Sequence, residues 1–595
     1  MAAERRLQAA ALAQPPVLPR KRGVPAPVSL TAAFILLHAL RLRTNSPAWQ
    51  FLSRPVPRVG LISRGFSASL PLVHRNSRRL LAILMLLLPG LAAAAGRESV
   101  QVTLDYVAKK AEDRARKPFR SPRLDLPAVL RQDNLDYDKY REIEFRHERA
   151  LWASDDMPFR VEFFHPGYIY HEPIHVNEFT LTHAQPIRFV QDFFNYRKLT
   201  IAKQIPTDTG YAGFRILTEL KGPGRWDELG SFLGASYFRL LGKGQRYGQS
   251  ARGLAIDSGE TDRPEEFPIF TDWWLGKPQK EDTQIRLYAI LDSVSCVGAY
   301  EFVIQPGDST IADIECVLYF RETNTVAAVN PNRKPITSVG IAPLTSMFWF
   351  GKNSERKFDD YRPEAHDSDG LLMHMENGEM LWRPLNNASV MRHQRFATKN
   401  LRGFGLCQRE RRYEAYQDIF NYYHQVPTVW VVPRGNWGEG DVHLLELSTQ
   451  YEGLDNIVAF WDPKVKPVPM QPKRYAYTLY WTSEDDMKLS QNRVISTRIG
   501  AHPRNGAWRQ IVIDFEGPRL AAIPEATPPA AIAHCSANAA ITENQVFYNP
   551  IQKNWRVIMA MQPRAENKDP VDLRCTLKLG EEVVSETWTY HWSPP

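Results

Sequence analysis

The fold class is decided by the stretch QIRLYAILDSVSCVGAYEFVIQPGDSTIADIECVLYFRET, residues 284–323. It holds runs rich in Ile, Val, Leu, Tyr and Phe at 284–293, 299–307 and 310–323, and these runs partly alternate between apolar and polar residues. Such residues favour the pleated, half-buried surface of a β-sheet. Turn-forming Gly, Pro and Asp residues separate the last two runs, so we expect neighbouring antiparallel strands.

Runs of the same kind recur on both sides of this stretch. They lie at 160–167, 172–182, 428–435, 441–449, 456–463 and 474–483. Only 98–150 looks mixed and partly helical. Strands do not alternate with helices, which argues against a parallel α/β sheet, and many short strands with turns between them favour packed antiparallel sheets.

A second unit is predicted after the connection TSEDDMKLSQN, residues 482–492. Four further segments carry strand-like runs, at 509–518, 545–563, 571–580 and 584–592, and a loop-rich part lies at 517–540. Their length and spacing suit an immunoglobulin-like sandwich. We therefore predict an all-β protein with a large β-sandwich over 98–482, a linker at 483–494 and an immunoglobulin-like domain over 495–595.

Length and charge narrow the possible functions. The chain has 595 residues, enough for two or more domains with sizeable cores. Residues 1–97 contain 14 of the 74 Lys and Arg residues but one of the 66 Asp and Glu residues, so the rest carries a net charge of about −5. A mildly acidic body argues against nucleic acid as a partner.

A targeting segment is predicted in RNSRRLLAILMLLLPGLAAAAG, residues 75–96. Basic residues precede an apolar run at about 80–91 and a small-residue end, which is the anatomy of a cleavable secretory signal peptide. The run is short for a membrane span of about 20 residues, so export is favoured over anchoring. The export route stays open. So does the status of the preceding 70 or so residues, which are either a basic extension or lie before the true start.

The five cysteines, Cys296, Cys316, Cys407, Cys535 and Cys575, show no CxxC spacing that would indicate a zinc site. In an oxidising compartment Cys296 could pair with Cys316, or Cys535 with Cys575. The commoner outcome is buried, inert thiols. Neither a metal nor a cofactor is predicted.

Aromatic residues interleaved with polar ones suggest a carbohydrate partner. Sugar rings stack their apolar faces on Trp and Tyr, while sugar hydroxyls bind carboxylates, Arg and Asn. Segments of this mixed kind are TDWWLG (271–276), LWRPLNN (381–387), FNYYHQ (420–425) and RGNWGEGD (434–441). Trp382 and Arg383 are candidate substrate-binding residues, although a tryptophan taken singly is more often part of a core.

The segment YRPEAHDSDGL, residues 361–371, gathers Glu364, His366, Asp367 and Asp369 without apolar periodicity. A solvated turn is the ordinary interpretation of such a segment. A calcium loop is disfavoured because Gly370 breaks it and no Glu stands at EF-hand spacing. A catalytic role requires a second carboxylate that the fold brings close.

Asp455, in YEGLDNIVAFW, offers such a partner because it directly precedes an apolar strand. A carboxylate at the edge of a buried sheet face is partly desolvated, which raises its pKa and suits a general acid. The plainer alternative is an ordinary turn aspartate before a strand.

The chain resembles the periplasmic glucans biosynthesis proteins, the G and D family, from about residue 98 to the C-terminus. The segments that carry the resemblance are 233–257, 287–302, GIAPLTSMFWFG (340–351), RPEAHDSDGL (362–371), NGEMLWRPLNN (377–387), GFGLCQRER (403–411), LDNIVAFW (454–461) and SETWTYHW (585–592). NPNRKPITSVGIAPLTSM (330–347) is closer to the G members than to the D members.

The resemblance implies a galactose-mutarotase-like sandwich followed by an immunoglobulin-like domain, and a role in making osmoregulated periplasmic glucans with a β-1,2-linked backbone. Some family members are inverting β-1,2-glucanases. Their general acid falls on Asp455 here and their general base on Asp367. Tyr423 matches a tyrosine along the substrate or proton path. Glu364, His366 and Asp369 would orient Asp367, bind sugar hydroxyls or relay a proton.

Three functions stay open from the sequence. The first is an inverting β-1,2-glucanase in the periplasm that trims the glucan backbone. The second is a non-catalytic glucan-binding scaffold that partners the inner-membrane glucan glucosyltransferase. The third, from fold analogy alone, is a mutarotase-like epimerase. Glucan length and branching, the turnover rate and the oligomeric state are not predicted.

Overall fold

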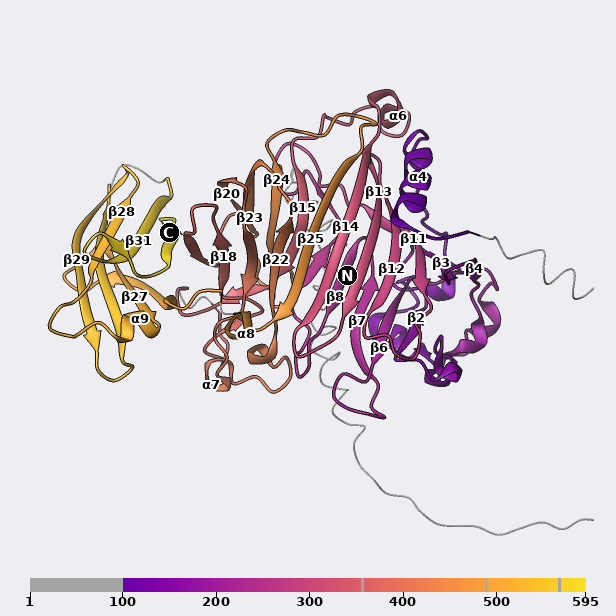
Figure 1. Ribbon diagram of the computed structural model, residues 1–595, viewed down its shortest axis with the longest axis horizontal. Helices are drawn as coiled ribbons and strands as arrows, with labels where there is room; N and C mark the ends of the chain where they lie inside the picture. The colour runs from indigo at the N-terminus through magenta and orange to yellow at the C-terminus, as the bar shows by residue number, and fades with distance from the viewer. Residues whose placement is uncertain (1–99, 355–357, 488, 565–568, 595) are drawn as a thin grey trace, which may run out of the picture.

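The computed structural model describes residues 100–354, 358–487, 489–564 and 569–594. The predicted N-terminal extension and signal peptide, residues 1–97, lie outside the described residues. β-Strands are the main regular secondary structure of the described residues, so the all-β prediction is confirmed (Figure 1). Within the described residues, none of the helices has both the length and the apolar character needed to cross a lipid bilayer.

The larger of the two main sheets has 15 strands. In spatial order, with β32 (Glu582–Val583) beside β31, they are β28 (Ala530–Cys535), β31 (Val571–Leu579), β33 (Thr587–Trp592), β19 (Met380–Pro384), β18 (Gly370–His374), β21 (Gly403–Cys407), β22 (Thr428–Arg434), β25 (Lys473–Thr482), β14 (Thr310–Phe320), β13 (Cys296–Gln305), β12 (Ile285–Asp292), β11 (Ile269–Gly276), β3 (His175–Phe179) and β4 (Ala184–Ile187). The opening stretch of sequence thus forms β12, β13 and β14, paired antiparallel as predicted.

The second main sheet has 10 strands. In order, with β10 (Ala255–Ile256) beside β15, they are β2 (Phe159–Phe164), β6 (Gly213–Thr218), β7 (Asp227–Leu233), β8 (Tyr237–Leu240), β9 (Ser250–Arg252), β15 (Val339–Ser346), β24 (Ile457–Pro463), β23 (Glu439–Glu446) and β20 (Arg392–Lys399). Two small sheets pair β1 (Glu144–Phe145) with β5 (Phe194–Asn195) and β16 (Phe348–Phe350) with β17 (Ala365–His366).

The main core lies between these two sheets. Side chains from both sheets belong to one buried cluster, and Phe232 of β7 meets Trp273 of β11 with ring centroids 4.8 Å apart. In the first half of β14 buried residues alternate with half-buried ones, which is why a period of two is visible in its sequence. The two sheets therefore form a sandwich whose inner faces are apolar.

Few helices are present in the described residues. Helix α4 (Leu104–Ala115) begins at Thr103, whose hydroxyl accepts a hydrogen bond from the backbone N–H of Tyr106 at 3.2 Å. It covers the outer face of β12–β14 with a small apolar cluster. The remaining α-helices are single turns: α5 (Tyr137–Tyr140), α6 (Thr323–Ala327), α7 (Tyr413–Tyr416), α8 (Glu484–Met487) and α9 (Pro518–Ala521).

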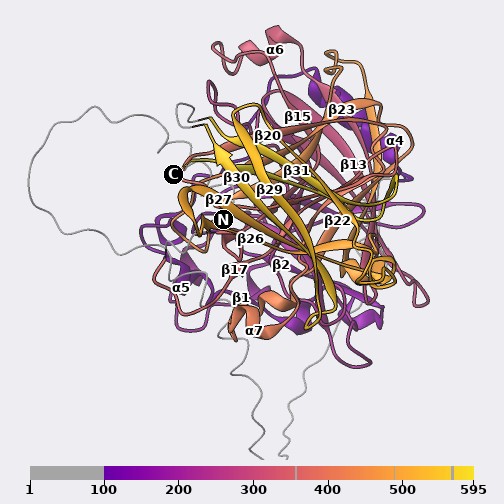
Figure 2. The same ribbon diagram turned by 90° about the vertical axis from the view of Figure 1, so that its left-hand side faces the viewer.

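The C-terminal part begins with β26 (Arg493–His502), which joins β27 (Asn505–Glu516), β30 (Asn554–Pro563) and β29 (Ala539–Asn549) in a four-stranded sheet. Figure 2 shows β29 and β30 running side by side at this end of the molecule. A second cluster of buried residues, including Trp555 and Trp588, fills its interior. Strand β28 lies in the segment predicted to be loop-rich. The sequence did not indicate this strand because its residues are mostly small.

The last strand ties the two parts together. β33 pairs parallel with β19, with Leu381 opposite Thr587 and Trp382 opposite Trp588. One sheet therefore runs without a break from the large sandwich into the C-terminal part. The division at 98–482, 483–494 and 495–595, and the mutarotase-like and immunoglobulin-like descriptions, stay predictions.

All five cysteines lie within the described residues and all are free thiols. Cys296 lies opposite Phe320 and Cys316 opposite Tyr300 on adjacent strands, while Cys535 lies opposite Leu573. Neither pairing considered from the sequence is formed.

Candidate active-site cleft

An open cleft of about 1790 Å³, measured to its mouth, lies against the large sandwich. It is lined by Asp367, which follows β17, by Asp455, which precedes β24, and by Tyr423, the first residue of the 3-10 helix at Tyr423–Gln425. The fold thus brings together three residues named from the sequence. The part of this space that water can enter, about 340 Å³, lies within the 300–1000 Å³ typical of ligand-binding pockets.

Asp367 is held in a tight, buried position. Its backbone N–H donates to Met347 O at 2.8 Å, and its residue surface is 8% exposed. A Cβ on Gly248 would lie 2.7 Å from Asp367 Oδ1, so glycine is needed for the chain to pass the carboxyl group. Burial, followed by the nearby charge of Asp455, raises the pKa of Asp367 to about 8. At neutral pH burial and the charge of Asp455 therefore keep a proton on Asp367.

Asp455 differs in its partners and exposure. Its carboxylate forms an ion pair with Arg239 at 3.7 Å, and its side chain is 14% exposed. The next residue, Asn456, anchors the turn by donating to Phe348 O and Leu447 O, both at 3.0 Å, and by accepting from Phe348 N–H at 2.8 Å. Asp455 is thus set firmly at the start of β24 while its carboxylate stays open to the cleft.

Tyr423 belongs to a third polar group in the cleft. Its hydroxyl donates to Glu452, which also accepts from Asn421 Nδ2 at 2.9 Å and from Arg362. Arg362 in turn reaches Asp418 at 2.7 Å. Glu452 was not singled out from the sequence, although it stands three residues before Asp455 in the same quoted motif. Its position next to Asp455 was the available signal.

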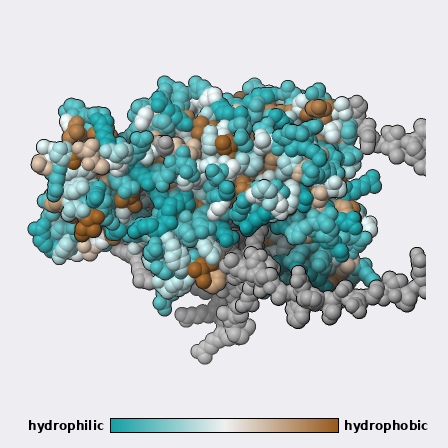
Figure 3. All heavy atoms as spheres, turned by 60° about the horizontal axis from the view of Figure 1, so that its bottom comes forward, coloured by the Kyte–Doolittle hydropathy of each residue, from teal (hydrophilic) through white to brown (hydrophobic). Residues whose placement is uncertain are grey.

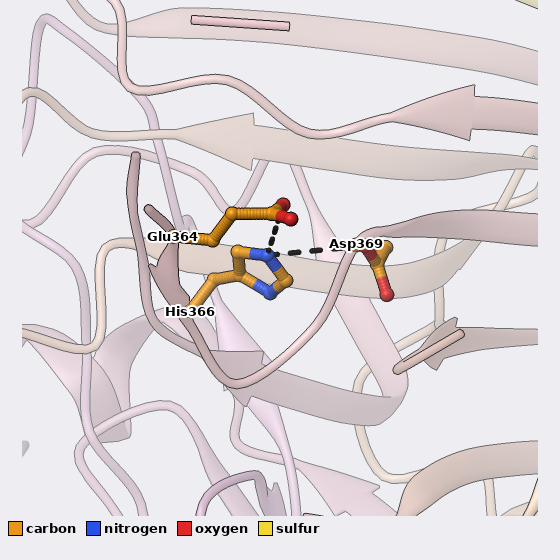
Figure 4. Close-up of side chains that lie close together, drawn as sticks. All are labelled: Glu364, His366 and Asp369. Atoms are coloured by element: carbon orange, nitrogen blue, oxygen red, sulfur yellow. Dashed lines mark hydrogen bonds and ion pairs between the residues drawn. The ribbon is translucent and has the colours of Figure 1, made fainter. Parts of the chain in front are cut away.

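Glu364, His366 and Asp369 do not line this cleft. His366 Nε2 lies 3.3 Å from Glu364 Oε2 and 3.8 Å from Asp369 Oδ1, as Figure 4 shows. They line a separate cavity of about 390 Å³, together with residues 494–497 of the C-terminal part. We call these three side chains and their partners the rear network.

The hydrogen bonds of His366 define its protonation. Gln408 Nε2 donates to two backbone carbonyls, so its Oε1 faces His366 Nδ1, which must donate. Nε2 faces two carboxylates and must donate as well. Burial lowers the pKa of His366, but the charges of Asp369 and Glu364 outweigh it and raise that pKa above its usual range.

The rear network has the side chains of a metal site, since donor atoms of Glu364, His366 and Asp369 lie within 4.8 Å of one another. The proton on Nε2 occupies the lone pair that a metal would need, so a metal could bind only by displacing that proton. Lys352 also places its ammonium 3.4 Å from Glu364. The network therefore balances its carboxylates with its own cations.

Trp382 and Arg383 do not lie in the cleft either. Trp382 is buried under the Arg409 guanidinium, which stands 3.5 Å from its ring centroid. Arg383 is fully buried and pairs with Glu446 at 2.9 Å. The structure thus assigns both side chains packing contacts, and their predicted contact with substrate has no support from their position.

Fold and site together define a β-sandwich protein with an open, carboxylate-lined cleft. The chain belongs to the family described as "Periplasmic glucan biosynthesis protein, MdoG", whose model matches residues 103–592. It is 38% identical over 499 residues to "Glucans biosynthesis protein G" of Pseudomonas paraeruginosa, covering 82% of this chain and 92% of the relative. Proteins of the same name from two Pseudomonas aeruginosa strains match equally well. The family resemblance is confirmed, and with it a role in glucan biosynthesis.

Proposed function

We propose that this protein acts in the periplasm, after export, where it binds β-1,2-glucan and hydrolyses its backbone with inversion, with Asp455 as general acid and Asp367 as general base. The observation that carries the proposal is the meeting of both carboxyl groups in one cleft, close enough for the charge of Asp455 to raise the pKa of Asp367. An inverting hydrolase requires two carboxyl groups on either side of one glycosidic bond.

The steps follow from these roles and start from the form of the pair in which its shared proton lies on Asp455 and Asp367 is ionised. Asp455 gives its proton to the glycosidic oxygen as the bond to the anomeric carbon breaks. Asp367 takes a proton from a water molecule that attacks that carbon from the opposite face, which leaves the new hemiacetal with inverted configuration. Tyr423 and Glu452 are placed to order sugar hydroxyls or the attacking water.

Exposed aromatic side chains around the cleft support a polymeric sugar. Tyr361, Phe420 and Tyr451 are 70%, 42% and 55% exposed. Each is next or near in sequence to a member of the buried Arg362–Asp418–Glu452 group, so all three loops are held at the same edge. Sugar rings beyond the reacting bond would stack on them. The face of the molecule in Figure 3 is mostly hydrophilic, with scattered apolar patches.

The alternative is a non-catalytic scaffold that holds glucan beside the membrane glucosyltransferase. One observation favours it: Asp367 keeps its proton at neutral pH, and a protonated carboxyl group is no base. Turnover would then be slow unless bound glucan helps Asp367 to ionise.

The deciding experiment incubates the protein, without residues 1–97, with linear β-1,2-glucan. Shorter products that form with wild type and vanish in Asp455→Asn support the hydrolase, and NMR of the first-formed anomer tests inversion. Calorimetric binding of glucan with no shortening supports the scaffold. Equilibration of free-sugar anomers without shortening would support an epimerase.

A further inference from the structure

The segment GFGLCQRER, residues 403–411, contains two adjacent buried side chains that face opposite ways. Gln408 reaches toward the cleft residues, and Arg409 reaches into the C-terminal part. Neither contacts the cleft cavity itself. Their adjacency adds a link between two regions that also meet through the β19–β33 pairing and a shared buried cluster.

Gln408 joins the backbones on which two cleft residues stand. Its Nε2 donates to His366 O at 2.9 Å and to Tyr423 O at 3.2 Å, while its Oε1 accepts from His366 Nδ1 at 3.0 Å. Gln408 is fully buried. His366 directly precedes Asp367, so one side chain ties the strand end before Asp367 to the turn that holds Tyr423.

Arg409 uses all five of its N–H donors on two regions: the connection after β25 and the C-terminal part. Nε and Nη2 donate to Glu484 at 2.8 and 2.7 Å, and Nη1 and Nη2 donate to Glu586 at 2.9 and 2.7 Å. The remaining Nη1 hydrogen goes to Val494 O at 2.7 Å. The two glutamates are buried, one after β25 and the other directly before β33.

Residues 403–411 also hold Asp369 through backbone hydrogen bonds. The backbone N–H groups of Arg409 and Glu410 donate to Asp369 Oδ2 at 2.5 and 2.9 Å. Asp369 lies two residues after Asp367, and its own backbone N–H donates to Cys407 O at 2.7 Å. Any shift of residues 408–410 therefore moves both ends of the 366–369 segment.

We propose that Gln408 and Arg409 form one positioning element, through which docking of the C-terminal part sets the placement of Asp367 and Tyr423. Both are positioning residues, since neither touches the cleft. The coupling itself follows from the contacts alone; only its kinetic consequence rests on the proposed hydrolase.

The test is amide hydrogen exchange, followed by mass spectrometry, on the complete mature protein. Glu586→Gln removes the charge of Glu586 and so weakens the ion pair that holds Arg409 to the C-terminal part. We expect exchange at 364–369 and 421–425 to speed up at least about fivefold, within the range of energetic coupling between sites. The matched control is Glu582→Gln, a change at an exposed ion pair with Arg519, which should leave both peptides unchanged.

A second variant keeps the test decisive if Glu586→Gln folds poorly. Gln408→Leu cuts the link on the cleft side only, so 364–369 and 421–425 should exchange faster while 493–497 and 586–592 stay protected. Faster exchange confined to the C-terminal part in Glu586→Gln would overturn the proposal. So would unchanged cleft peptides in Gln408→Leu.

Kinetics separate this proposal from the hydrolase. If wild type cleaves glucan, both variants should lower kcat about tenfold or more at nearly unchanged KM, because a small misplacement of reacting groups is costly. If wild type does not cleave glucan, the hydrolase fails and the exchange data still decide the coupling. Cleavage by wild type with unmoved cleft peptides would leave the hydrolase standing and reject the coupling.

Discussion

The cleft and the rear network hold similar residues in opposite electrostatic states. In the rear network each carboxylate has a counter-charge or backbone donors: Glu364 has Lys352 and His366, and Asp369 accepts two backbone N–H groups. In the cleft, Asp367 forms no ion pair among the described residues, and it stays protonated at neutral pH. A few residues of one segment thus serve two purposes. Compensated charges build the structure, whereas an uncompensated, desolvated one marks the place for chemistry.

The largest effect should come from the acid. Asp455→Asn is expected to lower hydrolysis of linear β-1,2-glucan by about 10²–10⁴-fold, because an amide cannot supply the proton. Glucan binding should persist, as measured by calorimetry. Glu364→Gln, in the rear network, should cost less than about tenfold, since Glu364 lies outside the cleft. Equal losses in both variants would erase the distinction between the two regions.

Removing the Arg409 cation, which lies behind the rear network and pairs with Glu484 and Glu586, should cost stability. Arg409→Met leaves Glu484 and Glu586 buried without their partner, which typically destabilises by about 3–5 kcal/mol. Urea denaturation at pH 7 measures the loss. The control is Arg519→Met, whose partner Glu582 is exposed, and it should change stability by less than about 1 kcal/mol. Similar losses in the two variants would mean that the buried ion pairs of Arg409 contribute no more to stability than an exposed ion pair does.

In the cleft, removing an ionisable group should raise the stability of the protein rather than lower it. The pKa of Asp367 is about 8 in the folded protein and 3.8 without the fold, so between these values the folded state holds a proton that the unfolded state has lost. This group therefore makes stability fall as pH rises from about 4 to 8. Asp367→Asn removes the effect and should stabilise the protein by up to about 4 kcal/mol at pH 7.

At pH 5 the stability gained by Asp367→Asn should fall below about 2 kcal/mol. At that pH the unfolded state gains less free energy by losing the proton of Asp367. Denaturation curves at both pH values provide the check. A gain that does not change with pH, or a loss of stability at pH 7, would show that Asp367 is not a strained, protonated group. The variant should also be inactive, which is the usual cost of relieving strain at a site.

The sequence predicted the sheets better than it predicted the connections between charges. Strands such as β12–β14 could be read from composition and alternation, because one face of each packs locally against a core. Asp367 and Asp455 were assigned from the family resemblance, since nothing in composition shows that residues 88 positions apart share a cleft. The bond network of Gln408 and Arg409 is purely tertiary and left no local signal.

Two residues predicted from the sequence to bind substrate are buried away from the cleft for a physical reason. Trp382 and Arg383 stand among polar residues in LWRPLNN, a pattern typical of sugar contacts. In the structure Arg383 pairs with the buried Glu446 instead, and β19 becomes an inner strand because β33 pairs with it. The partner strand comes from the end of the chain, about 200 residues away, so local sequence could not reveal the burial.

The smallest effect tests whether this pair carries the working proton. Hydrolysis needs one proton on the pair, so the rate should be level at neutral pH and fall about tenfold per pH unit above about 8, where Asp367 ionises. The fall is the same whichever of the two aspartates is the acid, because both assignments use the singly protonated pair. A profile of kcat/KM from pH 5.5 to 9.5 measures this alkaline limb, because it reports groups of the free enzyme. Arg239→Gln adds a second reading: loss of a nearby cation should move the limb to higher pH, whereas Lys352→Gln, in the rear network, should move it far less. Two carboxyl groups that share a cleft titrate as a pair, so a limb that ignores Arg239 would locate the working proton outside this pair.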